Sequence, residues 1–147
     1  MAAGRLGAGD EMPIKPSIAV IDGDQAYREA LVGQLRSCDL IAKTFPDAEE
    51  FLASARLSLT TCLIAELRLG GMSGLELYGQ LLARGTPIPT ILMTAGPDQQ
   101  TRVRALGAGV TALLNKPVNE SELLDCINRT MGRNAPHRRG KQSPAIR

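Results

Sequence analysis

The chain has 147 residues, enough for one domain with terminal segments, and 44% of them are apolar, which is normal for a globular protein. No apolar run approaches the roughly 18 residues that cross a membrane, and residues 1–16 lack the apolar centre of a signal peptide, so we expect a cytoplasmic protein. The net charge of +2 is unevenly spread, because residues 132–147 hold five basic residues and no acid, which leaves the rest mildly acidic.

Five short apolar runs alternate with five amphipathic patterns along the chain. Residues 1–16 are rich in Gly, Ala and Pro and predict a flexible lead. The predicted strands are residues 17–21, 40–45, 61–65, 90–94 and 110–114. A helical pattern follows each run, and the predicted N-caps of the last four helices are Asp47, Ser73, Asp98 and Asn119.

In the first and third helices the apolar residues give the predicted inward faces. Tyr27 and Leu31 belong to that face of the first helix, and Leu82 to that of the third. The fourth helix carries Val103 and Leu106, with Arg102 on a solvated face.

Alternating strands and helices with short connections predict a parallel sheet with helices on both faces. The common solution at this size is an α/β, doubly wound, flavodoxin-like sheet of five strands in the order 2-1-3-4-5 with five helices. Residues 17–131 form this domain, and residues 132–147 are a basic, disordered tail.

Three cysteines, Cys38, Cys62 and Cys126, are widely separated and show no Cys-x-x-Cys spacing. A disulfide framework or a zinc site is therefore disfavoured, and we predict buried free thiols.

Polar residues collect where the predicted strands end. Because the carboxyl ends of parallel strands lie at one edge of a sheet, these residues are expected to face one crevice. They are Asp22, Gly23 and Asp24 after the first strand, Glu66 after the third, Thr94 and Ala95 at the fourth, and Lys116 and Pro117 after the fifth.

Four motifs occur in order on the predicted elements: Val20-Ile21-Asp22, Met72-Ser73-Gly74-Leu75-Glu76-Leu77, Ile91-Leu92-Met93-Thr94-Ala95 and Asn115-Lys116-Pro117. With these residues the chain resembles the receiver domain of bacterial two-component response regulators, most closely the nitrogen-fixation and LuxR-type regulators. The resemblance covers residues 17–131. It implies a phosphoacceptor aspartate after the third strand, two acidic residues that help to hold Mg²⁺, and a Thr and a Lys that hold the transferred oxygens.

The sequence departs from that pattern at four positions. Glu66 occupies the phosphoacceptor position, and Gly23 replaces the second acidic residue, although Asp24 follows it. Gly70 stands where the family usually has Pro, and Leu113 replaces the aromatic residue that moves on activation. The residues that match are Asp22, Thr94, Ala95, Lys116 and Pro117.

The departures predict altered chemistry. Glu is one methylene longer than Asp, which moves its carboxylate by about 1.5 Å, and a misplacement near 1 Å can cost about a hundredfold in an oriented reaction. We therefore expect no productive phosphotransfer and weak or lost Mg²⁺ binding, with Asp22, Asp24 and Glu66 as the remaining candidate ligands. The chain is not expected to be an enzyme or to need a cofactor.

The longer side chain of Glu66 also has a structural consequence. It is able to pair with Lys116 and to accept a hydrogen bond from Thr94, which would hold the domain in one conformation without a signal. The alternative is an inert pocket kept only by packing. The sequence leaves open whether the fixed state is active-like or inactive, and Leu113 argues against the active-like version.

These features predict an atypical, stand-alone receiver that acts by binding a protein, such as a histidine kinase or another regulator. A homodimer through residues 98–131 is one arrangement that the resemblance implies. The alternatives are a working phosphoacceptor, nucleic-acid contact through the basic tail and a small flavodoxin-like enzyme or nucleotide binder. The last is disfavoured because Asp22 and Asp24 repel phosphate.

Overall fold

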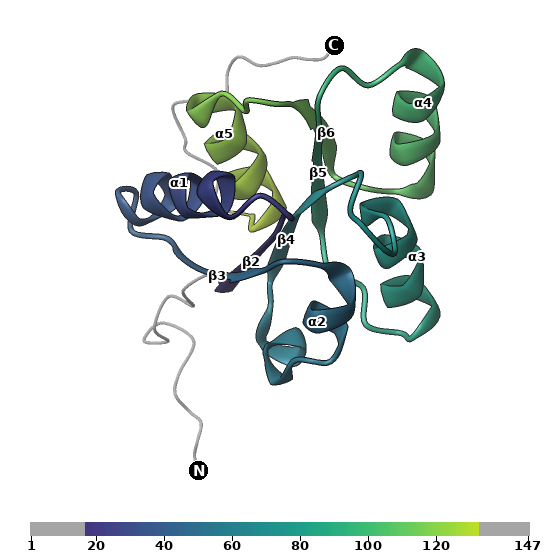
Figure 1. Cartoon of the computed structure of the whole chain (residues 1–147), viewed down its shortest axis with the longest axis horizontal. Helices are drawn as coiled ribbons and strands as arrows, with labels where there is room; N and C mark the ends of the chain where they lie inside the picture. Colours follow the sequence, from purple (N-terminus) through teal and green to yellow (C-terminus); the bar gives the residue numbers. More distant parts are fainter. Residues whose placement is uncertain (1–16, 133–147) are drawn as a thin grey trace.

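The computed structural model describes residues 17–132, and at their centre is a sheet of five parallel strands (Figure 1). The strands are β2 (Ser17–Ile21), β3 (Ile41–Phe45), β4 (Cys62–Glu66), β5 (Thr90–Thr94) and β6 (Ala112–Asn115). They lie in the order β3-β2-β4-β5-β6, and every neighbouring pair is parallel. With the strands numbered along the chain this is the order 2-1-3-4-5, so the predicted fold is confirmed.

Helices cover both faces of the sheet (Figure 1). On one face lie α1 (Gln25–Arg36) and α5 (Glu120–Thr130); on the other lie α2 (Ala48–Leu52), α3 (Gly74–Ala83) and α4 (Gln99–Ala108). Successive strand residues point to opposite faces, so Ile18 and Val20 pack under α1 and α5 while Ala19 and Ile21 pack on the other side. The sheet therefore separates two apolar cores.

The predicted helix starts are confirmed by their caps. The side chains of four N-cap residues each accept a hydrogen bond from a backbone N–H in the first turn, which satisfies one donor at the helix end. These residues are Asp47, Ser73, Asp98 and Asn119. At α3 the carboxylate of Glu76 also accepts from the backbone N–H of Ser73, which completes a capping box.

The second and third strands differ from the predicted bounds by one residue, and two other elements differ more. The last strand begins at Ala112 rather than at residue 110, because Gly109 ends α4 with a φ of 111° and the N–H of Val110 still bonds to the carbonyl of Ala105. The second helix ends at Leu52, and a 3-10 helix, η2 (Ala55–Leu59), follows it.

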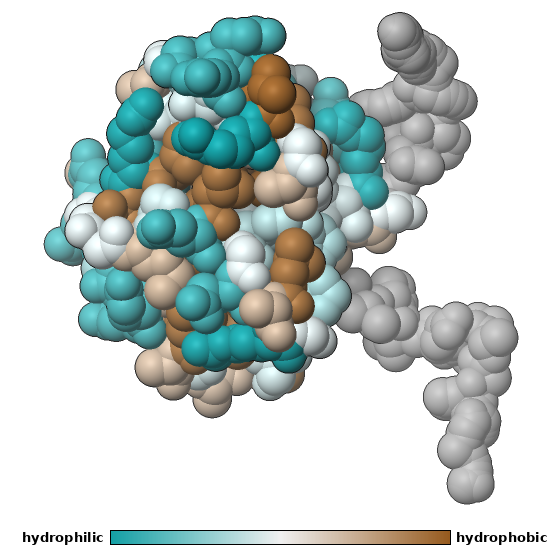
Figure 2. Space-filling model, turned by 90° about the vertical axis from the view of Figure 1, so that its right-hand side faces the viewer, coloured by the Kyte–Doolittle hydropathy of each residue, from teal (hydrophilic) through white to brown (hydrophobic). Residues whose placement is uncertain are grey.

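The predicted inward position of Leu82 on α3 is wrong, and the two apolar residues noted on α4 also lie at the surface. Leu82, Val103 and Leu106 are 45%, 60% and 45% exposed. On α4 the short side chains of Thr101 and Ala105 face the sheet instead, and on α3 the inward stripe includes Leu77 and Leu81. Figure 2 shows this side of the molecule, where hydrophobic residues interrupt a hydrophilic surface.

The predicted lead (residues 1–16) and nearly all of the predicted tail lie outside the described residues. Between residues 17 and 132 no helix has both the length and the apolar character needed to cross a membrane.

Candidate functional site

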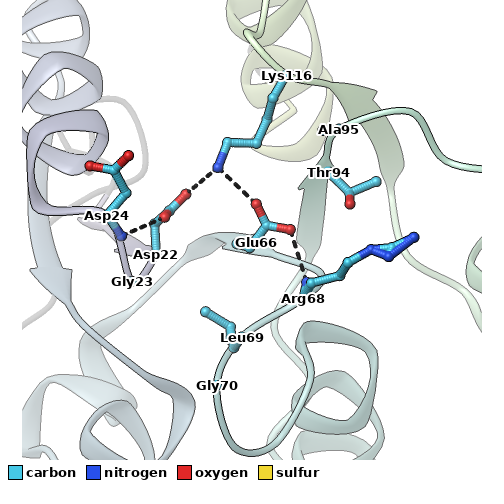
Figure 3. Close-up of a pocket in the computed structure, with 10 residues that line it drawn as sticks. All are labelled: Asp22, Gly23, Asp24, Glu66, Arg68, Leu69, Gly70, Thr94, Ala95 and Lys116. Atoms are coloured by element: carbon cyan, nitrogen blue, oxygen red, sulfur yellow. Dashed lines mark hydrogen bonds and ion pairs between the residues drawn. The ribbon is translucent and has the colours of Figure 1, made fainter.

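An open pocket of about 470 Å³ lies at the carboxyl ends of β2, β4 and β5 and beside the segment that follows β6 (Figure 3). Its lining residues are Asp22, Gly23, Asp24, Glu66, Arg68, Leu69, Gly70, Thr94, Ala95 and Lys116. The structure thus brings together the site residues predicted from the strand ends, except for Pro117, which does not line the pocket. It adds Arg68 and Leu69 to them.

Glu66 is the last residue of β4, and its carboxylate is held at both oxygens. Oε1 lies 2.8 Å from the Nζ of Lys116, and Oε2 accepts a hydrogen bond of 2.9 Å from the backbone N–H of Arg68. The residue is 8% exposed. The ion pair expected between Glu66 and Lys116 is therefore present.

Asp22 follows β2 directly and is 2% exposed. Its Oδ2 lies 2.9 Å from the Nζ of Lys116, and its Oδ1 accepts from the backbone N–H of Asp24 at 2.9 Å. Its backbone carbonyl accepts from the Nη1 of Arg28. Every polar atom of the Asp22 carboxylate is therefore engaged within the fold.

Lys116 bridges the two carboxylates (Figure 3). Partial burial lowers the pKa of its ammonium group, but hydrogen bonds and negative charge from Glu66 and Asp22 outweigh burial, so the pKa lies above the ordinary lysine value. Lys116 is consequently the cation that neutralises the centre of the pocket.

Thr94 ends β5, and its side chain does not bond to Glu66. The hydroxyl is buried, the residue is 1% exposed, and Oγ1 has no hydrogen-bond partner in the described part of the chain. The prediction of a hydrogen bond from Thr94 to Glu66 is therefore wrong. The carboxylate oxygens of Glu66 face Lys116 and the N–H of Arg68 instead. Ala95, the next residue, is exposed at the rim.

Asp24, the residue after Gly23, has a structural role at the start of α1. Its Oδ1 accepts from the backbone N–H of Tyr27, so the side chain serves as the N-cap of α1. Among residues 17–132 there is no group of three or more His, Cys, Asp or Glu side chains placed to hold a metal ion. Glu66 and Asp22 instead share the ammonium group of Lys116.

The loop between β4 and α3, which contains Gly70, is held from α2. The Oε2 of Glu49 accepts a hydrogen bond of 3.0 Å from the backbone N–H of Met72. A Cβ at Gly71 would lie 2.7 Å from the same oxygen, so the carboxylate packs tightly against this glycine. Glu49 thus restrains the loop that borders the pocket.

Leu113, at the predicted switch position, belongs to the core and is 5% exposed. Its backbone carbonyl accepts a hydrogen bond of 3.3 Å from the Nη1 of Arg102, which joins α4 to β6. Arg102 is therefore not simply solvated, as the sequence suggested.

Sequence reasoning missed three residues that support the site. Tyr27 places its ring under the Nζ of Lys116, with 4.3 Å between that nitrogen and the ring centroid. The side chain of Arg28 donates a hydrogen bond to the backbone carbonyl of Asp22, and the backbone N–H of Arg68 donates one to the carboxylate of Glu66. The first two lie one turn after a helix N-cap that faces the pocket, and that position was the available signal.

A parallel sheet in this order, with an acid after β2, an acid at the end of β4, a hydroxyl at the end of β5 and a lysine after β6, defines a flavodoxin-like signalling domain. Residues 18–128 match the response regulator receiver domain family, and the chain belongs to that family. Receiver domains of this family are modules of two-component signalling.

Relatives of the nitrogen-fixation kind are among the similar proteins. Nodulation protein W of Bradyrhizobium diazoefficiens is 32% identical over 139 residues, which are 95% of this chain and 61% of that protein. The transcriptional regulatory protein FixJ of Azorhizobium caulinodans is 33% identical over 134 residues, 91% of this chain and 63% of FixJ. The chain thus spans about three fifths of the length of these relatives.

A solved structure agrees with the fold. The response regulator StyR is 39% identical, has a TM-score of 0.74, and is matched over 87% of this chain and 65% of its own. The resemblance to response regulators of this kind is therefore confirmed.

Proposed function

We propose that this receiver domain works without phosphorylation and signals by binding another protein. One observation carries the proposal: the Nζ of Lys116 lies within 2.9 Å of carboxylate oxygens of both Asp22 and Glu66. The two acids and the base of the pocket are thus paired with one another.

The position of Glu66 supports the loss of phosphotransfer. If Glu66 stands where relatives carry an aspartate, its carboxylate is displaced by about 1.5 Å, and such a shift is expected to cost about a hundredfold or more. Each oxygen of Glu66 also already accepts a hydrogen bond, Oε1 from the Nζ of Lys116 and Oε2 from the N–H of Arg68, and these bonds withdraw electron density and make the carboxylate a weaker nucleophile. Both geometry and pairing therefore oppose the reaction.

Weak or lost Mg²⁺ binding belongs to the same proposal. Mg²⁺ requires near-octahedral oxygen ligands and gives up its water reluctantly. Gly23 offers no side-chain oxygen, Asp24 caps α1, and Asp22 already binds Lys116. An ion entering the pocket would have to compete with an ammonium group for its best ligand.

The unpaired hydroxyl of Thr94 helps to decide whether the domain is held in an active-like or an inactive conformation. A receiver held in an active-like state needs the Thr to contact the group at the phosphoacceptor position, and Thr94 Oγ1 makes no such bond in the described residues. We therefore favour a domain whose pocket charges are paired with one another but whose conformation is not active-like.

The partner is proposed to be a protein, either a histidine kinase, another regulator or a second copy. The supporting feature is the surface of α4, where Val103 and Leu106 are exposed beside Arg102 and Arg104. This surface lies within residues 98–131, the face that the sequence suggested for dimer formation.

The test is incubation with acetyl phosphate and Mg²⁺, followed by intact mass measurement. We expect no gain for the wild-type chain, whereas the double variant Gly23→Asp/Glu66→Asp should gain one phosphoryl group. Gly23→Asp alone is the matched control and should stay unmodified. A stoichiometric, acid-labile gain in the wild type would instead establish the alternative, a working phosphoacceptor.

A further inference from the structure

Lys116 has a third neighbour besides the two carboxylates. An ammonium group has three N–H donors, and two of them are directed at Asp22 and Glu66. The Nζ also lies 4.3 Å from the centroid of the Tyr27 ring, well within the range of a cation–π contact. The side chain of Lys116 as a whole is 19% exposed, so most of it is covered.

Tyr27 is itself fixed at two points. Its backbone N–H donates to the Oδ1 of Asp24 in the first turn of α1. Its hydroxyl accepts a hydrogen bond of 3.1 Å from the backbone N–H of Val118, two residues after Lys116. The ring therefore cannot move away from Lys116 without breaking the contact between α1 and the segment that follows β6.

These contacts form a closed ring. Asp22 accepts from Asp24, Asp24 accepts from Tyr27, the Tyr27 ring holds Lys116, and Lys116 returns to Asp22. Three of the four residues, Asp22, Asp24 and Lys116, line the pocket. Tyr27 is the member that comes from the body of a helix, and it links α1 to the β6–α5 segment.

We propose that Tyr27 is a positioning residue, whose ring holds Lys116 in the place where it bridges Asp22 and Glu66. This deepens the proposed function, on which it rests, because a lysine held from three sides is not free to turn toward the oxygens of an incoming phosphoryl group. Without the ring, Lys116 gains freedom to turn toward solvent, and the carboxylate of Glu66 loses its partner for part of the time.

The experiment follows the ammonium group of Lys116 directly. The chain has four lysines, Lys15, Lys43, Lys116 and Lys141, so ¹⁵Nζ-lysine labelling gives few NMR signals. The Lys116 signal is the one lost in Lys116→Met. Its hydrogen-exchange rate and its pKa are then measured in three variants: Tyr27→Leu, Tyr27→Phe and Tyr78→Phe.

Tyr27→Leu should speed hydrogen exchange at Lys116 Nζ by about tenfold and return its pKa toward the ordinary lysine value. Tyr27→Phe keeps the ring and should preserve both values, while only the Val118 amide exchanges faster. Tyr78→Phe is the matched control: it removes a tyrosine hydroxyl that bonds to Gly109 at 3.0 Å and should leave Lys116 unchanged.

Three results would overturn the proposal. Unchanged exchange and pKa at Lys116 in Tyr27→Leu would show that the ring does not position it. Equal effects of the Phe and Leu variants would assign the role to the hydroxyl. If Tyr27→Leu fails to fold, the absence of a nuclear Overhauser effect between the Lys116 ε-protons and the Tyr27 ring in the wild type decides against the proposal. The phosphorylation test measures the mass of the wild-type chain and does not depend on Tyr27. Failure of the proposed function and failure of the positioning role of Tyr27 are therefore told apart.

Discussion

The backbone carbonyl of Glu66 lies so close to Gly74 that a Cβ on this glycine would be 2.6 Å from the carbonyl oxygen. The same Cβ would meet Leu92 Cδ2 at 3.0 Å. The start of α3 therefore packs directly on the end of β4. The contact thus lies at Glu66, which lines the pocket.

Gly74→Ala should consequently destabilise the domain. Overpacking a core typically costs about 1–3 kcal/mol, which exceeds the gain of up to about 1 kcal/mol from a better helix former. The measurement is urea unfolding. Gly79→Ala is the matched control on the same helix, because a Cβ there meets nothing within 4 Å; it should be neutral or stabilising. Equal effects of the two substitutions would contradict the close packing of Gly74 on Glu66.

The Glu66–Lys116 ion pair should appear as non-additive energy. In a double-mutant cycle of Glu66→Gln and Lys116→Met, we expect a coupling of about 0.5–3 kcal/mol in the free energy of unfolding. A parallel cycle of Glu76→Gln with Lys116→Met is the control, since Glu76 caps α3 and should add within about 0.5 kcal/mol. Additive effects in the first cycle would mean that the pocket is inert.

The raised pKa of Lys116 predicts a dependence of stability on alkaline pH. Because the folded pKa lies above the unfolded value of about 10.4, the contribution of Lys116 is fully present below that value and is lost as pH rises through the folded pKa. The gap in unfolding free energy between the wild type and Lys116→Met should therefore narrow at high pH. A constant gap for Lys116 would contradict the pairing.

Much of the fold and of the pocket could be predicted because each depends on local pattern. Strand residues such as Ile18 and Val20 are apolar and β-branched, and caps such as Ser73 have their partner three residues away. Once the sheet order is known, the strand ends must share one edge, which brings Glu66 and Lys116 together without further information.

The errors concern side chains whose surroundings depend on distant segments. The sequence predicts the inner side of α1 for Tyr27, and its place one turn after the N-cap Asp24 is the only local signal. Its pairing with Lys116 and Val118 joins residues about 90 positions apart, which no local pattern shows. Val103 and Leu106 are the apolar residues of the α4 pattern, yet both are exposed. The helix instead packs through Thr101 and Ala105, and only the tertiary spacing between α4 and the sheet decides between these faces.

The cysteines give a last prediction, since burial was predicted for all three but differs among them. Cys62 is fully buried, and burial, followed by the charge of Cys126, raises its pKa to about 12. Burial likewise raises the pKa of Cys126, whereas Cys38 is only half-buried.

Because the thiolate is the reactive form, iodoacetamide at pH 8 should alkylate Cys38 first, and the other two only after unfolding. Peptide mass mapping measures this, and Cys38→Ser should leave the native protein unmodified. Native-state alkylation of Cys62 as fast as that of Cys38 would show that β4 opens, which would also free the carboxylate of Glu66.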